Sequence, residues 1–128
     1  MLEPSEHVDW VDRRNRCDSE SISLVLLQRV REDVERANRS RSNGKALAVI
    51  GTSERFEVSA EDKFDGRSVC FCRSKDRIDF MPSGKSKRIV TWMWQMNDAD
   101  CQLLLDGNKA ELWQISQAAL YDLFFPEG

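Results

Sequence analysis

Arg88-Ile89-Val90-Thr91-Trp92-Met93-Trp94-Gln95-Met96 is the longest run of this chain with a period of two. Successive side chains of a β-strand point to opposite faces of a sheet. One alternate set is wholly apolar and consists of Val90, Trp92, Trp94 and Met96, whereas the set between them is mixed. The pattern predicts a central strand with one face buried and the other partly covered. We therefore expect a sheet that extends outward from this strand.

The segment before the sheet is predicted to hold one long helix. Its apolar residues recur every three or four positions, at Ile22, Leu26, Val30, Val34 and Ala37. Asp18 or Ser19 is suited to cap its start, and Asn43-Gly44 to end it. Residues 1–17 are polar and predicted to form a flexible arm in which Trp10 packs as an anchor. Residues 18–128 then form a single domain, as expected for this length.

Short alternating runs after the predicted helix indicate a meander. Residues 46–50, 55–59, 67–73 and 77–81 read as strands joined by polar turns. Residues 101–105 read as a further strand, which Asp106-Gly107 turns into a strand over residues 110–115. A helix from Asp98 capped by Gly107 is the alternative. Ser116 is expected to cap a final helix closed by Pro126.

Together these elements predict an α+β fold. The expected core is an antiparallel meander of about six to seven strands, curved or half-barrel in shape. The long N-terminal helix and the short C-terminal helix are predicted to pack on one face of that sheet, because each has an apolar stripe to bury.

Composition argues against several classes of protein. The 128 residues are 41% hydrophobic and 32% charged with a formal net charge of -3, which is typical of a globular domain and gives no general reason to expect nucleic acid or anionic membrane as partner. No apolar run is long enough to span a bilayer, and the N-terminus lacks a signal-peptide pattern, so a cytoplasmic location is expected. The four cysteines are accordingly predicted to be free thiols.

A basic segment nevertheless stands out. Residues 73–88 carry six basic and two acidic residues, whereas residues 92–128 carry one basic and six acidic residues. The basic side chains are Arg73, Lys75, Arg77, Lys85, Lys87 and Arg88. They form a candidate contact patch, and a regulator that binds nucleic acid through residues 73–88 is the weaker alternative function.

Catalytic and metal motifs are poorly supported. The single histidine, His7, lies in the predicted arm, and Gly84-Lys85-Ser86 lacks the first glycine and the helix of a phosphate-binding loop. Cys70 and Cys72 supply too few ligands for structural zinc. We predict no catalytic residue, no metal and no cofactor. A small enzyme that uses carboxylates such as Asp79 or Glu111 in a half-barrel pocket remains the alternative.

Aromatic and methionine residues around the central strand suggest a binding role. These candidates are Trp92, Met93, Trp94, Met96, Phe71, Phe80 and Trp113. They either line an apolar pocket or fill a dry core, and pattern alone leaves both open. The sequence therefore favours a small non-enzymatic binding protein. Its expected partner is another protein or a second copy of itself, through a sheet face or edge, or a small apolar ligand.

Overall fold

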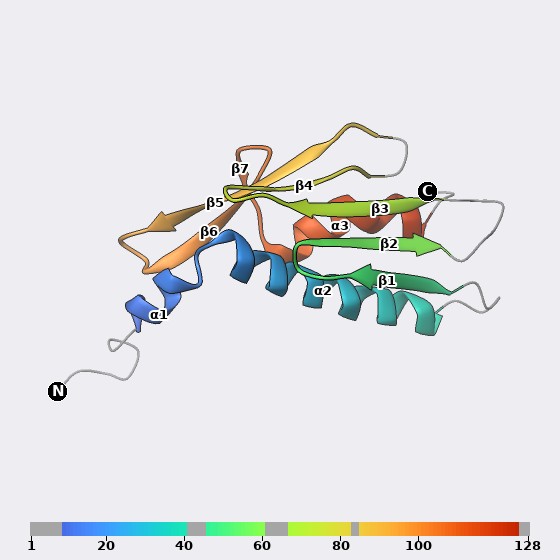
Figure 1. The fold of residues 1–128 in the computed structure, drawn as a ribbon, viewed down its shortest axis with the longest axis horizontal. Coiled ribbons are helices and arrows are strands. Elements are labelled where there is room, and N and C mark those ends of the chain that lie inside the picture. The colour runs from blue at the N-terminus through green and yellow to red at the C-terminus, as the bar shows by residue number, and fades with distance from the viewer. Residues whose placement is uncertain (1–8, 41–45, 61–66, 83–84, 126–128) are drawn as a thin grey trace.

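The computed structural model of the chain describes residues 9–40, 46–60, 67–82 and 85–125. It is an α+β fold in which one seven-stranded antiparallel sheet carries its helices on one face (Figure 1). The sheet is not closed into a barrel, and its strand order follows the chain from β1 to β7. The predicted fold class is thus confirmed. Within the described ranges, no helix combines the length and the apolar character needed to cross a membrane.

The long helix α2 (Ser19–Ser40) is confirmed at its predicted position. The carboxylate of Asp18 accepts a hydrogen bond from the backbone N–H of Ser21 at 2.8 Å and so caps the helix. The predicted stripe is buried, and its most buried members are Leu26 and Val30. The expected stop at Asn43-Gly44 lies outside the described residues.

The meander begins with two hairpins in predicted places. The first four strands are β1 (Leu47–Gly51), β2 (Arg55–Ala60), β3 (Ser68–Arg73) and β4 (Ile78–Phe80). Their helix-facing side chains form the centre of the core, where Phe71 lies between Phe56 and Phe80. The ring of Phe71 stacks on that of Phe56 with centroids 4.5 Å apart, and the Phe80 ring lies 5.3 Å away.

The stretch that decided the prediction forms β5 (Arg88–Gln95), the longest strand. Val90 is fully buried beneath the helices, and Trp92 is half-buried against the same core. Trp94 is half-buried as well, but Met96 lies beyond the strand and is 82% exposed. The predicted buried face is therefore confirmed near the start of the strand and lost toward its end.

The alternatives over residues 98–107 resolve in favour of the hairpin. Residues Asp100–Leu105 form β6, which pairs with β5 along its whole length. Asp106 and Gly107 both have positive φ, of 52° and 86°. Positive φ at both residues is what a two-residue hairpin turn needs to match the twist of the flanking strands. The strand after this turn, β7, is only Asn108–Lys109.

The predicted strand over residues 110–115 is wrong. Helix α3 (Leu112–Phe124) begins there instead, with Glu111 at its N-cap. The backbone N–H of Glu111 donates to the side-chain oxygen of Gln114 at 2.8 Å, one half of a capping box. Ser116, the expected cap, lies inside the helix and is buried. The helical spacing of Ile115 and Ala119 decides the outcome, because both bury on the same face.

The predicted N-terminal arm contains structure that the sequence did not reveal. Residues Trp10–Asn15 form the short helix α1, and the Arg13 guanidinium donates to the carbonyl of Ala99 at 3.4 Å. Trp10 is 59% exposed rather than packed as an anchor. Residues 1–8, which include His7, lie outside the described residues.

The prediction of four free thiols is corrected by a disulfide between Cys17 and Cys101. It joins the segment after α1 to β6 across 84 positions of sequence, with Cα atoms 5.5 Å apart. A disulfide depends on the distance between two cysteines in the fold, which their separation in the sequence does not give, so this pairing could not be predicted from the sequence. Cys70 and Cys72 are free, as predicted. The free thiols were predicted from the expected cytoplasmic location, whereas disulfides persist mainly in oxidising compartments.

Gly51 should tolerate alanine far less well than Gly107. Both have positive φ, of 123° and 86°. A Cβ at Gly51 would overlap the carbonyl oxygen of Arg55 and lie 2.8 Å from the Cα of Phe56, whereas nothing lies within 4 Å of a Cβ at Gly107. We expect Gly51→Ala to cost about 3 kcal/mol of unfolding free energy and Gly107→Ala about 1 kcal/mol. Urea unfolding measures both, and equal losses would contradict the prediction.

Candidate functional site

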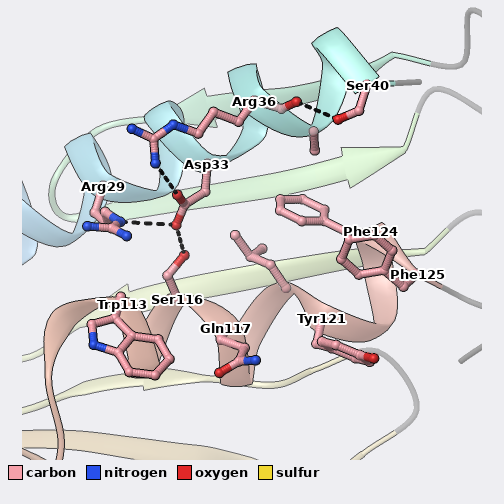
Figure 2. A pocket seen from close by; sticks show the side chains of 12 residues that line it. Arg29, Asp33, Arg36, Ser40, Trp113, Ser116, Gln117, Tyr121, Phe124 and Phe125 are labelled. Atoms are coloured by element: carbon pink, nitrogen blue, oxygen red, sulfur yellow. Dashed lines mark hydrogen bonds and ion pairs between the residues drawn. The ribbon is translucent and has the colours of Figure 1, made fainter. Parts of the chain in front are cut away.

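Helices α2 and α3 lie side by side on the sheet and run in the same direction. In Figure 2, Trp113 of α3 and Arg29 of α2 lie at one end of the two helices, and Phe124 and Ser40 lie at the other. A hollow of about 350 Å³ lies between the two helices. Its walls are formed by Arg29, Asp33, Arg36, Ala37, Ser40, Trp113, Ser116, Gln117, Leu120, Tyr121, Phe124 and Phe125.

Asp33 ties the two helices together at this hollow. Its carboxylate accepts a hydrogen bond from the buried hydroxyl of Ser116 at 2.6 Å and one from the Nε of Arg29 at 3.2 Å. A guanidinium nitrogen of Arg36 lies 4.0 Å from its other oxygen. One carboxylate is therefore shared by two guanidinium groups. The Arg36 side chain is 65% exposed and free to reach a second anion.

Aromatic side chains form the opposite wall. Trp113, Gln117, Tyr121 and Phe125 follow one another at four-residue intervals, which places them along one side of α3. The three aromatic residues among them are between 45% and 57% exposed, an unusual amount for such large apolar groups. Trp113 is held in place because its indole N–H donates to Oε2 of Glu111 at 2.6 Å.

A second hollow, of about 430 Å³, lies at the other end of α2. Its lining is almost wholly apolar, and Leu24 and Val25 of α2 are each about half exposed there. The disulfide holds β6 against this end of the helix, so Cys101 belongs to the lining. The full set is Arg16, Ser21, Ile22, Leu24, Val25, Cys101, Leu103 and Leu112.

The two hollows occupy the same flank of α2. Lining residues recur along that helix at Val25, Arg29, Asp33, Arg36 and Ser40, every three or four positions. On α3, Leu112 lines the second hollow, and residues at each following turn, from Trp113 to the C-cap Phe125, line the first. We name this surface the α2–α3 groove and define it by the lining residues of both hollows. At 1.5 Å per residue, its α2 wall is roughly 23 Å long between Val25 and Ser40.

The binding residues predicted from sequence are not gathered in one place. Phe71 and Phe80 are core residues with no access to solvent. Met93 is half exposed on the sheet face without helices, opposite to Trp92 on the same strand. Of the seven predicted residues, only Trp113 is among the lining residues of these two hollows, and it lines the first.

Most of the predicted basic patch is paired with carboxylates. Lys85 bonds to Asp122 at 2.8 Å and Lys87 to Asp79 at 2.9 Å. Arg88 pairs with Asp106, and a nitrogen of Arg73 lies 3.6 Å from Glu54. Lys75 and Arg77 are exposed at the turn between β3 and β4. These pairings reduce the positive field that phosphate recognition needs.

The predicted carboxylates do not converge on one cavity. Asp79 faces the side of the sheet that bears no helix, whereas Glu111 caps α3 on the other side. Glu57, a third carboxylate on a strand, is on the same face as Asp79 but two strands away, roughly 10 Å across the sheet. The arrangement thus provides no carboxylate pair at a shared substrate position among these three residues.

The two free cysteines sit side by side on β3. Their sulfur atoms are 3.8 Å apart on the helix-free face. Burial, followed by the hydrogen bond and charge of Cys72, raises the pKa of the Cys70 thiol above its usual value. A raised pKa disfavours the thiolate, which is the nucleophile and the metal ligand. In the described part of the chain, no three histidine, cysteine or acidic side chains are placed to hold a metal ion.

No family model, curated protein or solved structure matches the chain. The groove therefore has to be interpreted from its own chemistry. Its aromatic wall was readable in the sequence as the four-residue spacing from Trp113 to Phe125. The wrong prediction of a strand over residues 110–115 concealed this spacing, because a strand places successive side chains on opposite faces, with a period of two instead of four.

Proposed function

We propose that this protein is a non-enzymatic binding protein and that a segment of a partner protein occupies the α2–α3 groove. The observation that carries the proposal is the exposure of large apolar side chains inside a concave surface. Val25, Trp113 and Tyr121 are each about half exposed there. Exposed apolar side chains that gather in one hollowed surface are typical of interaction sites.

The sheet edges offer less than the groove for such a contact. The side chain of Asn38 bonds to both the N–H and the carbonyl of Leu47, at 2.8 and 3.0 Å, and so occupies the first outward-facing position of β1. At the opposite edge, β7 has only two residues. Short or covered edges pair poorly with another strand. Self-association through an edge is therefore a weaker form of the proposal than contact through the groove.

A small apolar ligand is a second candidate for the same surface. The hollow beside Leu103 and Leu112 has a volume of about 430 Å³ and an almost wholly apolar lining. That volume falls within the range of roughly 300–1,000 Å³ found for small-molecule pockets. The open length of the groove favours a protein segment, because a compact ligand would leave the aromatic end uncovered.

Site-specific photo-crosslinking in the native cell tests the proposal. A benzophenone amino acid at Tyr121 in the groove is compared with one at Met96, which is exposed in the turn between β5 and β6. We expect a protein crosslinked from position 121 and absent from position 96. When that protein is purified, its affinity for the Val25→Glu variant should be at least about tenfold lower than its affinity for the wild type.

Ile50→Glu provides the matched control for Val25→Glu, since Ile50 is 67% exposed on the far side of the sheet. It should leave the affinity unchanged. No crosslink at position 121, the same crosslinks from both positions, or equal losses for the two glutamate variants would overturn the proposal. A crosslink to a second copy of the chain would show self-association through the groove.

A further inference from the structure

We infer that the segment held by the α2–α3 groove is an amphipathic α-helix that carries two carboxylates about two helical turns apart. This inference rests on the proposed function and adds the chemistry of the partner. It follows from three properties of the groove: the nature of its walls, its length and its charge.

The walls favour a helix over an extended chain. Most of both walls is α-helical, and the backbone N–H and C=O groups of a helix are already bonded within it. Where β6 lines the groove, the carbonyl of Leu103 already accepts from the N–H of Ala110, and the N–H of Cys101 donates to the side chain of Asp100. An extended segment would therefore bury many of its own backbone groups without partners. A helix satisfies its backbone internally and offers only side chains to the groove.

The length of the groove fits the same occupant. The α2 wall extends roughly 23 Å from Val25 to Ser40, which corresponds to about four turns of a docked helix. Such a helix would form a third element beside α2 and α3. Side chains at successive turns could then enter the apolar hollow near Leu103 and contact the aromatic wall near Tyr121.

The charge of the groove is positive although the whole chain is acidic. Its charged lining residues are Arg16, Arg29 and Arg36 against the single carboxylate of Asp33, whereas the chain has a formal net charge of -3. A partner with acidic side chains complements this surface, and arginine binds carboxylates through two parallel hydrogen bonds.

The spacing of two of these arginines sets the pattern on the partner. Arg29 and Arg36 are seven residues apart on α2, about 10.5 Å along the helix axis. Two carboxylates at positions i and i+7 of a partner helix have the same separation, with apolar residues at i+3 and i+4 directed into the groove. Asp33 lies between the two arginines on α2; it accepts a hydrogen bond from Arg29, and a nitrogen of Arg36 lies 4.0 Å from its other oxygen.

Selection from a display library of random 24-residue peptides tests the inference on the full-length protein. We expect enriched peptides to be helical when bound, with Asp or Glu seven residues apart around an apolar pair. Arg36→Glu should weaken their binding at least about tenfold, and exchanging for lysine the one peptide carboxylate that faces Arg36 should restore it. Arg31→Glu, on the exposed outer side of α2, changes the net charge equally and should leave binding unchanged.

The possible failures are distinguishable. Two outcomes would overturn the proposal of an acidic helix but leave a groove-binding function. In the first, the selected peptides depend on Val25 but lack the acidic pair; in the second, Arg31→Glu and Arg36→Glu weaken their binding equally. The inference would also be overturned if the binding of the peptides were insensitive to Val25→Glu, or if no peptide were enriched. In that case photo-crosslinking at Tyr121 would still test separately whether the groove binds a protein. A concentration-dependent dimer in sedimentation that Arg36→Glu dissociates would instead assign the groove to a second copy.

Discussion

Replacing Cys17 and Cys101 together with alanine should lower the free energy of unfolding by up to about 4.5 kcal/mol, because the disulfide closes a loop of 84 positions. A cross-link of that span restricts the unfolded chain strongly, and its removal returns that entropy to the unfolded state. Urea unfolding of the oxidised wild type and of the double variant measures the difference. A reducing agent should destabilise the wild type to a similar extent.

The two free cysteines provide the control for this prediction. A Cys70→Ser and Cys72→Ser variant keeps the cross-link and should remain sensitive to reducing agent, whereas the Cys17 and Cys101 variant should not respond at all. Equal midpoints for oxidised and reduced wild type would contradict the prediction and would mean that the bond adds nothing to the stability of the fold.

Phe71→Ala should remove about 3–5 kcal/mol of unfolding free energy, a large part of the roughly 5–15 kcal/mol of a typical domain. The Phe71 side chain is fully buried at the middle of the row formed with Phe56 and Phe80. Its truncation leaves a cavity and breaks both ring contacts, each of which contributes beyond simple burial. Thermal or urea unfolding gives the value.

Met96→Ala is the matched comparison, because Met96 is 82% exposed and should contribute no more than about 0.5 kcal/mol. Phe71→Leu should fall between the two, since it keeps much of the apolar volume. If Phe71→Ala were as mild as Met96→Ala, the aromatic row would not be the centre of the core.

The elements that could be predicted from the sequence are those with a strong and uninterrupted period. The four-residue spacing from Ile22 to Val34 marked α2, and the alternation of residues 55–59 and 88–94 marked strands with their buried faces. In each case one side of the element packs against the core, so the regular spacing of the apolar residues shows which side is buried.

Features that depend on distant parts of the chain could not be predicted in this way. The disulfide requires knowledge of where α1 meets β6, and the start of α3 depends on a glutamate at a cap position more often taken by serine or aspartate. Trp113 was selected as a binding residue, but its partners on α2 follow only from the packing of two helices distant in sequence. The groove is therefore a property of tertiary structure.

The sequential strand order has a consequence for how the chain folds. Each strand pairs only with its neighbours in sequence, so the sheet can grow one hairpin at a time, with little loss of entropy from loop closure. Helix α3 follows all seven strands in the chain, and it supplies most of one wall of the groove. A nascent chain released before residue 112 would possess the whole sheet but no site, and the flank of α2 would stay open to chaperones until α3 is made.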